Sequence, residues 1–250
     1  TLLWLVTILK CLFRSKPYLS NNMISVCMAT YNGAKYIKEQ VNSILPQLSN
    51  DDELIVSDDG STDNTLDILR SYNDKRIKIF SNDNRKSIVG NFENAIKHSQ
   101  GEYIFLCDQD DVWLEGKVEK CVAALQNTDL VLHDAMVWNG VEIINESFFR
   151  LRNSKKGYIN NLIKNSYIGC CMAFKKNLKS KILPFPNVAM HDIYIGLIAE
   201  KYFKTTLIYE SLLLYRRHGA NASKTSEKST YSLYFKLKYR LKMLLYTVFK

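Results

Sequence analysis

The sequence lacks the short motifs that mark several large functional classes. Neither a G-x-x-x-x-G-K-[ST] loop nor a G-x-G-x-x-G turn occurs, so ATP-driven and nicotinamide chemistry are without their usual phosphate-binding loop. The six cysteines include no C-x-x-C pair, and Cys27 and Cys107 lie within apolar runs as small hydrophobic residues. This cysteine usage fits a reducing cytosol.

Long Gly/Ser linkers, low-complexity tracts and internal repeats are also missing from the 250 residues. A clean division into two domains is therefore not supported, and we expect one main domain. We assign residues 23–223 to that domain, residues 1–22 to an apolar, basic N-terminal segment, and residues 224–250 to a basic amphipathic helix.

Acidic residues are scarce at the two ends of the chain, and this decides how the net charge of +9 is interpreted. Residues 1–22 contain three basic and no acidic side chains, and residues 224–250 contain seven basic side chains with Glu227 as the one acid. Residues 23–223 hold 24 of each sign, so this part has no electrostatic footprint for nucleic acid, and we predict no such partner. The basic, apolar ends predict contact with an anionic membrane surface, which places the protein at the inner face of the cytoplasmic membrane.

Each end of the chain leaves more than one interpretation open. The stretch 1–13 is apolar but too short to cross a bilayer, so it is an interfacial segment, a truncated anchor or foreign to the natural chain. Near the other end, Leu233, Leu237, Leu241 and Val248 recur at helical spacing among basic residues. This pattern predicts a helix that either packs on the domain or lies on a membrane surface.

From residue 23 onward, short apolar runs alternate with helical patterns, which is typical of α/β proteins with a mainly parallel sheet flanked by helices. We predict strands at residues 24–29, 53–57, 77–80, 103–107 and 130–137, and a further apolar run at 167–174. We predict helices at residues 34–48, 65–72, 88–99, 114–125 and 191–202. Polar turns follow three of these strands, at residues 31–33, 58–60 and 108–111, where such sheets collect ligands.

The run Asp108-Gln109-Asp110-Asp111 places three carboxylates directly after a strongly apolar strand. Like charges this close raise each other's pKa unless a cation or a set of donors compensates them. Oxygen ligands select a hard ion, so we predict Mn²⁺ or Mg²⁺, whose shell substrate phosphates commonly complete. The alternative is that Asp110 or Asp111 only caps the helix that begins near Leu114.

The second acidic turn, Asp58 to Asp63, carries a weaker signal because Asp, Gly, Ser and Thr are also common turn residues. In it, Ser61 or Asp63 is expected to cap the following helix. In the functional interpretation, the Asp59 carboxylate accepts a hydrogen bond from a pyrimidine ring N–H. The Tyr31 ring could stack on the same base.

Together these three motifs, in this order, resemble those of the family-two glycosyltransferases over residues 23 to about 220. The resemblance implies a GT-A fold, with residues 23–137 binding a nucleotide sugar and residues 138–223 shaping the acceptor side. The form Asp-Gln-Asp-Asp-Val-Trp, with Asn91-Phe92-Glu93-Asn94 upstream, is most similar to rhamnosyltransferases of bacterial surface polysaccharides.

The resemblance also implies roles for individual residues. The predicted nucleotide-binding residues are Ala29, Thr30, Tyr31, Asn32, Glu39, Asp58, Asp59, Asp108 and Gln109. The predicted metal ligands are Asp108, Asp110 and His218, where His218 could instead be an ordinary loop histidine. Asp192, at the start of a late helix, is the predicted catalytic base, with His191 as the alternative by its ordinary pKa. The predicted sugar and acceptor pocket contains Asp111, Trp113, Gly169, Cys170 and His191.

The predicted activity is that of an inverting, metal-dependent, hexosyltransferase-type glycosyltransferase in bacterial surface polysaccharide assembly. Its expected partners are a dTDP- or UDP-linked sugar donor and a saccharide acceptor, with a lipid-linked saccharide as one option. Two alternatives stay open. A nucleotidyltransferase also uses an α/β sheet, carboxylates and a metal, and a non-catalytic protein could bind the nucleotide sugar without turnover.

Overall fold

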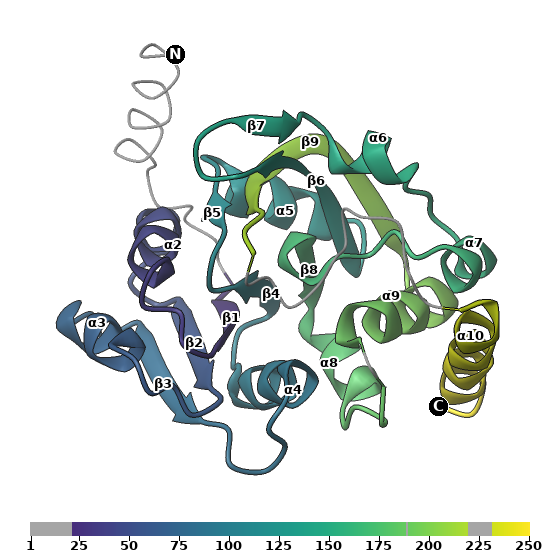
Figure 1. Ribbon diagram of the computed structural model, residues 1–250, viewed down its shortest axis with the longest axis horizontal. Helices are drawn as coiled ribbons and strands as arrows, with labels where there is room; N and C mark the ends of the chain where they lie inside the picture. The colour runs from purple at the N-terminus through teal and green to yellow at the C-terminus, as the bar shows by residue number, and fades with distance from the viewer. Residues whose placement is uncertain (1–21, 189, 220–231) are drawn as a thin grey trace.

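A computed structural model describes residues 22–188, 190–219 and 232–250 (Figure 1). Its strands are β1 (Ile24–Thr30), β2 (Glu53–Asp58), β3 (Ile77–Ser81), β4 (Tyr103–Asp108), β5 (Val112–Trp113), β6 (Leu130–Trp138), β7 (Ile143–Asn145), β8 (Met172–Lys175) and β9 (Thr205–Arg216). Its helices are α2 (Ile37–Ile44), α3 (Thr65–Ser71), α4 (Ile88–His98), α5 (Lys117–Leu125), α6 (Phe148–Arg152), α7 (Tyr158–Ile163), α8 (Lys176–Ile182), α9 (His191–Tyr202) and α10 (Leu233–Val248), with short 3-10 helices η1 (Leu45–Gln47) and η2 (Gly169–Cys171).

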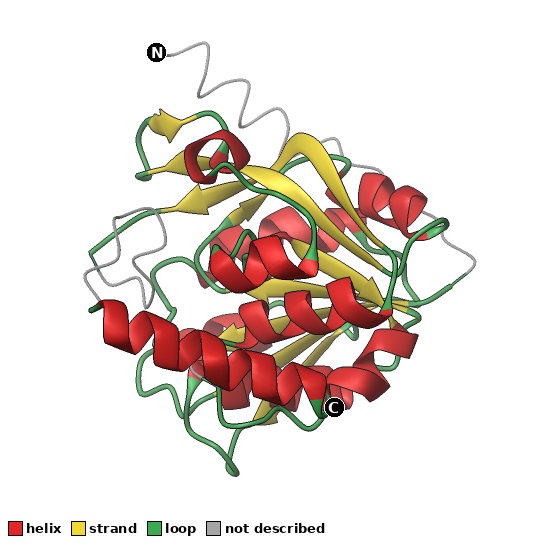
Figure 2. Ribbon diagram, turned by 90° about the vertical axis from the view of Figure 1, so that its right-hand side faces the viewer, coloured by secondary structure: helices red, strands yellow, loops and turns green. Residues whose placement is uncertain are grey.

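The strands form one mixed sheet in the order β3-β2-β1-β4-β8-β6-β9-β5, with β7 paired to β6. Strands β3, β2, β1 and β4 run parallel, and β8 joins β4 antiparallel. Helices cover the sheet (Figure 2), so its central strands are buried and almost wholly apolar. The predicted α/β class with a mainly parallel, helix-flanked sheet is confirmed.

The second half of the chain departs from the predicted pattern at β9, which the sequence did not mark. Its first half is partly exposed and its last five residues are buried, so neither strict alternation nor a continuous apolar run results. This strand pairs with β6 in parallel and with β5 antiparallel. The apolar run 167–174 is only partly a strand, because η2 precedes the short β8.

One predicted helix start and one predicted helix cap differ from the structure. The helix predicted from Leu114 begins at Lys117, because Val112 and Trp113 pair with β9 as β5. The N-cap of α3 is Asn64, while the Asp63 carboxylate accepts a hydrogen bond from the Thr65 N–H at 3.0 Å. Asp63, and not Ser61, therefore serves the first turn of α3.

The predicted C-terminal helix is present as α10, which packs against α7 and α9 at the edge of the molecule (Figure 1). Residues 1–21 of the predicted N-terminal segment lie outside the described residues. Among the described helices, none combines the length and the apolar character that a membrane-spanning helix needs.

Candidate active site

The three polar turns meet at one edge of the sheet because their strands are neighbours in register. Thr30 at the end of β1 lies opposite Asp58 at the end of β2. Ala29 on β1 lies opposite Asp108 at the end of β4. The carboxyl ends of these parallel strands therefore bring the loops after β1, β2 and β4 together, as expected for a ligand site of an α/β sheet.

Asp58 organises the turn after β2 through hydrogen bonds to its own loop. Its carboxylate accepts from the Gly60 and Ser61 N–H groups at 3.0 and 2.8 Å, and from the Ser61 hydroxyl at 2.6 Å. The buried Thr30 hydroxyl also donates to it, at 3.0 Å. With this many donors already bound, Asp58 shapes the loop that presents Asp59.

Asp59 is oriented by Asn82, a residue that the sequence analysis did not single out. The Asp59 N–H donates to the Thr30 carbonyl at 2.9 Å. The buried Asn82 amide donates to the Asp59 carboxylate and to the Arg85 carbonyl, both at 2.8 Å. The sequence offers one indication of this role, because Asn82 is a polar residue directly after the third strand, at the same edge of the sheet as the other turns.

Gln109 links the acidic run to the loop after β1. Its side-chain oxygen accepts from the Tyr31 N–H at 2.9 Å, and its side-chain nitrogen donates to the Tyr31 carbonyl at 3.0 Å. A Cβ at Gly33 would lie 2.2 Å from the Gln109 oxygen, so any larger residue there would force the Gln109 side chain out of this position. The Tyr31 ring itself is 56% exposed and free to contact a ligand.

Asn32 ties the loops after β1 and β2 together. Its backbone adopts a left-handed conformation with φ of 49°, which Asn tolerates better than most residues. The Asn32 N–H donates to the Ser61 hydroxyl at 2.9 Å, and its side-chain oxygen accepts from the Thr62 N–H at 2.8 Å. These hydrogen bonds fix the positions of the two predicted nucleotide-binding loops relative to each other.

The acidic run after β4 concentrates negative charge in a buried place. Burial first, and then the charges of Asp110 and Asp192, raise the pKa of Asp108 to about 7. Burial and the same run also raise the pKa of Asp111 well above its ordinary value. One oxygen each of Asp108 and Asp111 lies within 4.8 Å of the other and of the Cys170 Sγ. A cation would relieve this crowding.

Asp110 points toward the loop after β9. The His218 Nε2 lies 2.8 Å from its Oδ2, and the His218 ring stacks on Tyr36 with centroids 4.6 Å apart. An imidazole nitrogen and a carboxylate oxygen at this separation form a pair that could share one metal ion. The structure therefore brings together two of the three predicted ligands directly, and Asp108 belongs to the same run.

Asp192 and His191 begin α9 beneath the same edge. Burial raises the pKa of Asp192 to about 7, and its charge is one of those acting on Asp108. The His191 ring stacks on Phe92 with centroids 4.1 Å apart, and burial lowers its pKa to about 3. A histidine with so low a pKa is a poor base at neutral pH, which favours Asp192.

The sequence of the chain also matches a known protein family. The sequence profile of glycosyl transferase family 2 matches residues 25–183. The chain belongs to this family. The protein is therefore a glycosyltransferase. Asp192, Arg216 and His218 lie beyond the matched residues, so their positions are known from the structure alone.

Sequence relatives of this glycosyltransferase include bacterial enzymes. An Escherichia coli protein, WfgD, is described as a UDP-Glc:α-D-GlcNAc-diphosphoundecaprenol β-1,3-glucosyltransferase. It is 29% identical over 177 residues, covering 70% of this chain and 68% of that protein. A Bacillus subtilis glycosyltransferase named for teichuronic acid biosynthesis, TuaG, is 26% identical over 221 residues, covering 85% and 86% of the two chains.

Solved structures share the fold at lower identity. Staphylococcus aureus TarS, residues 1–349, in complex with UDP-GlcNAc superposes with a TM-score of 0.67 at 19% identity, covering 89% of this glycosyltransferase and 66% of that chain. The mannosyltransferase PcManGT from Pyrobaculum calidifontis, with GDP-Man and Mn²⁺, gives a TM-score of 0.62 at 20% identity, covering 88% and 65%. The GT-A fold expected from the sequence is confirmed.

Arg216 is the main residue of the glycosyltransferase site that the sequence analysis missed. Its main-chain N–H donates to Asp111 at 2.9 Å and its Nε to the Asp110 carbonyl at 2.7 Å. Its guanidinium pairs with Glu39 and lies 4.2 Å from the Trp138 ring centroid. The buried Arg216 thus fastens the acidic run to α2. The signal was the motif Tyr-Arg-Arg-His, in which only the histidine was assigned.

The residues predicted to line the acceptor pocket of the glycosyltransferase are mostly enclosed. Asp111, Trp113 and Cys170 are buried, and Lys117 lies beneath them, donating from Nζ to the Cys170 carbonyl at 2.8 Å and lying 4.1 Å from the Trp113 ring centroid. A Cβ at Gly169 would lie 2.9 Å from the His191 Nε2. These residues pack beneath the acidic run. Their contact with an acceptor stays a prediction.

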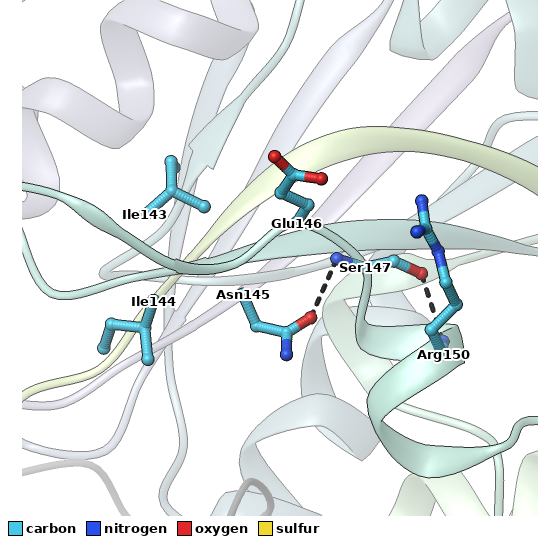
Figure 3. Close-up of a pocket in the computed structure, with 6 residues that line it drawn as sticks. All are labelled: Ile143, Ile144, Asn145, Glu146, Ser147 and Arg150. Atoms are coloured by element: carbon cyan, nitrogen blue, oxygen red, sulfur yellow. Dashed lines mark hydrogen bonds between the residues drawn. The ribbon is translucent and has the colours of Figure 1, made fainter.

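A separate hollow of about 350 Å³ lies between β7 and α6 (Figure 3). Its lining residues are Ile143, Ile144, Asn145, Glu146, Ser147 and Arg150. Asn145 accepts from the Ser147 N–H, and the Ser147 hydroxyl accepts from the Arg150 N–H (Figure 3). None of the predicted site residues lines this hollow, so it is distinct from the edge where the three turns meet.

Proposed function

We propose that this glycosyltransferase moves a sugar from a nucleoside-diphosphate donor to an acceptor hydroxyl with inversion, as a step in bacterial surface polysaccharide assembly. One observation supports this most strongly. The buried carboxyl of Asp192 interacts electrostatically with Asp108, next to the Asp110–His218 pair, at the edge where the β1 and β2 loops gather. These contacts support a site in which the base, the metal-binding centre and the nucleoside-binding loops lie side by side.

The donor set at this edge fits a divalent metal ion. The crowded carboxylates of Asp108 and Asp111 carry raised pKa values, and the Asp110 Oδ2 lies 2.8 Å from the His218 Nε2. We assign the ion, Mn²⁺ or Mg²⁺, to Asp108, Asp110 and His218. When bound, such an ion neutralises the charge that develops on the departing diphosphate.

Asp111 and Cys170 are the competing ligands near Asp108, and we assign them a supporting role. A thiol is a soft ligand, whereas Mg²⁺ and Mn²⁺ prefer oxygen. Asp111 is already bound by the Arg216 N–H and is closed off from solvent. An ion held there would be remote from water and diphosphate, which usually complete its shell.

Asp192 acts as the general base in this proposal. It accepts the proton of the acceptor hydroxyl while that oxygen attacks the anomeric carbon from the face opposite the nucleotide, and configuration inverts. A base whose pKa lies near the working pH balances being deprotonated against the driving force for proton transfer. The pKa of Asp192, raised by burial to about 7, fits this requirement.

The nucleoside part of the donor is assigned to Tyr31 and Asp59. Tyr31 offers an exposed ring for stacking, and Asp59 offers a carboxylate oriented by Asn82. We propose a UDP- or dTDP-linked donor, because both pyrimidines present a ring N–H to such a carboxylate. The names of WfgD and the TarS complex include UDP-linked sugars, which supports the uridine option, while rhamnose as the transferred sugar rests on motif form alone.

The proposed acceptor is a saccharide, with a lipid-linked one as the first choice, used at the inner face of the cytoplasmic membrane. WfgD is named for a diphosphoundecaprenol-linked acceptor. The basic C-terminal helix supports such a location, since positive charge favours an anionic bilayer surface.

A thermal-shift screen of nucleoside diphosphates and their sugars, with and without Mn²⁺, tests the proposal. We expect stabilisation by a uridine or thymidine diphosphate that requires Mn²⁺ and is lost in Asp110→Asn. The exposed Asp67→Asn on α3 serves as the charge-matched control. Donor turnover by the purified protein separates the enzyme from a protein that only binds nucleotide sugar. Release of pyrophosphate from a nucleoside triphosphate and a sugar phosphate would indicate a nucleotidyltransferase instead.

A further inference from the structure

The outer face of α10 is an apolar stripe that no described part of the chain covers. Leu237, Leu241, Leu245 and Val248 recur at helical spacing and are 46–57% exposed. The opposite face of the same helix packs inward through the buried Met243 and Thr247. Helix α10 is therefore apolar on two faces. Packing against the domain explains the inner face but not the exposed outer face.

Helix α7 extends this apolar face. Ile159 and Ile163, four residues apart on α7, are 63% and 58% exposed. The two helices are in contact, and the Tyr158 hydroxyl of α7 hydrogen-bonds with the Thr247 hydroxyl of α10. Figure 1 shows α7 beside α10 at the edge of the molecule, away from the sheet.

Acidic residues are missing from the segments that surround this face. Residues 147–191, which include α6, α7 and α8, contain nine lysines and arginines and no aspartate or glutamate. Residues 233–250 contain five basic residues and again no acid. Of the two acids on α9, Asp192 is buried, and Glu200 accepts a hydrogen bond from the Tyr167 hydroxyl at 2.7 Å.

Lysines of α8 and α9 lie at the C-terminal end of α10 and contact its main-chain oxygens. Lys201 donates to the Thr247 carbonyl at 2.9 Å, and Lys181 to the main-chain oxygen of Lys250 at 3.1 Å. Lys238 and Lys242 are exposed beside the apolar stripe. The face thus combines exposed aliphatic side chains with a border of positive charge.

We propose that the α7–α10 face, made of Ile159, Ile163, Leu237, Leu241, Leu245 and Val248, docks on the surface of an anionic lipid bilayer. Its aliphatic side chains enter the acyl boundary while the lysines contact the headgroups, as for other interfacial helices. A second copy of this chain is a poorer occupant, because two acid-free faces would bring lysines against lysines.

The docking geometry also places the bilayer near the proposed base. Helix α10 runs along α9, which carries Asp192 at one end and contacts Thr247 through Tyr202 at the other (Figure 2). Tyr239 of α10 lies close enough to Asp192 for that charge to help raise the pKa of the tyrosine. A saccharide held on a lipid in the same bilayer would then lie on the side of α10 that carries this face. Only this last step rests on the proposed function.

Cosedimentation of the full chain with lipid vesicles tests the docking surface. We expect binding to vesicles of equimolar phosphatidylglycerol and phosphatidylcholine, weakened by high salt, and little binding to phosphatidylcholine alone. The double variant Leu241→Glu and Leu245→Glu should bind at least about tenfold more weakly. The matched control, Val141→Glu and Ile144→Glu, adds the same charge at exposed positions near β7 and should bind like the wild type.

Equal vesicle binding by the α10 double variant and the wild type would overturn the proposal. A wild-type dimer by light scattering that the α10 variant converts to monomer, without vesicle binding by either, would overturn it in favour of self-association. Sugar transfer to a soluble acceptor should be the same in the α10 variant and the wild type. Vesicle binding without any transfer by the wild type would leave the surface intact while the proposed function fails.

Discussion

The His218 Nε2 lies 2.8 Å from the Asp110 Oδ2, across 108 residues of sequence. If both groups hold the same ion, each variant should weaken Mn²⁺ binding. We expect His218→Ala and Asp110→Asn each to lower Mn²⁺ affinity by at least about tenfold in calorimetry. Asp67→Asn should leave the affinity unchanged. Wild-type affinity in His218→Ala would show that this histidine is an ordinary loop residue.

The raised pKa of Asp192 predicts the pH dependence of turnover. Asp192 must be deprotonated to accept a proton, so kcat should fall by about tenfold per pH unit below about 7 and level off above it. Asp192→Asn should lower kcat by two to four orders of magnitude, roughly the contribution of a general base. A profile that rises toward acid pH would identify a group acting as an acid instead.

Asp108 predicts an unusual stability profile for the metal-free protein. Its folded-state pKa, about 7, exceeds the ordinary value, so the folded state binds the proton more tightly than the unfolded state. Ionising it therefore costs stability as pH rises from about 4 through about 7, so the stabilising contribution of this one group is fully present only below that window. We expect Asp108→Asn to raise the Tm of the metal-free protein at pH 8 and to abolish stabilisation by Mn²⁺. An unchanged Tm would contradict the buried-charge explanation.

Gly33 and Gln109 should be coupled energetically. Gly33→Ala places a Cβ against the Gln109 amide, and Gln109→Ala removes that amide along with both hydrogen bonds to Tyr31. We expect each single variant to weaken nucleotide binding by about tenfold, the equivalent of roughly 1.4 kcal/mol. The double variant should be no worse than Gln109→Ala alone, since the clash is gone. Additive losses would mean that the two residues act independently.

Arg216 should stabilise both the fold and the metal site. Arg216→Ala removes the ion pair with Glu39 and the hydrogen bond to the Asp110 carbonyl. We expect a loss of about 1.5–3 kcal/mol in unfolding free energy, together with weaker Mn²⁺ binding. Arg70→Ala on the exposed side of α3 is the matched control. A stability loss without any change in Mn²⁺ affinity would show that Arg216 does not position the acidic run.

Much of the site could be predicted because its loops follow apolar strands. The Asp58, Asp108 and Tyr31 turns come directly after buried strands, and parallel pairing then brings them to one edge. The order and type of these elements follow from local periodicity. For the same reason the α/β class and the helices α3, α4 and α9 could be expected from the sequence.

The residues that were missed act through contacts between distant segments. Arg216 meets Glu39 across 177 residues, and β9 becomes a strand only because β6 and β5 offer partners on both sides. Lys117 looks like a surface lysine at a helix start, yet it is fully buried beneath Cys170 and Trp113. Local patterns contain no information about such pairings, which depend on the completed sheet.

The central claim is that Asp192 and the Asp108–Asp110–His218 set form one inverting transfer site. A ¹H NMR time course of transfer from the donor selected by thermal shift, run with wild type and Asp192→Asn, tests it most directly. We predict that the wild type forms the product anomer opposite to the donor, and that Asp192→Asn forms it at least about a hundredfold more slowly while binding donor and Mn²⁺ normally. A product that keeps the donor configuration, or normal turnover by Asp192→Asn, would contradict the claim.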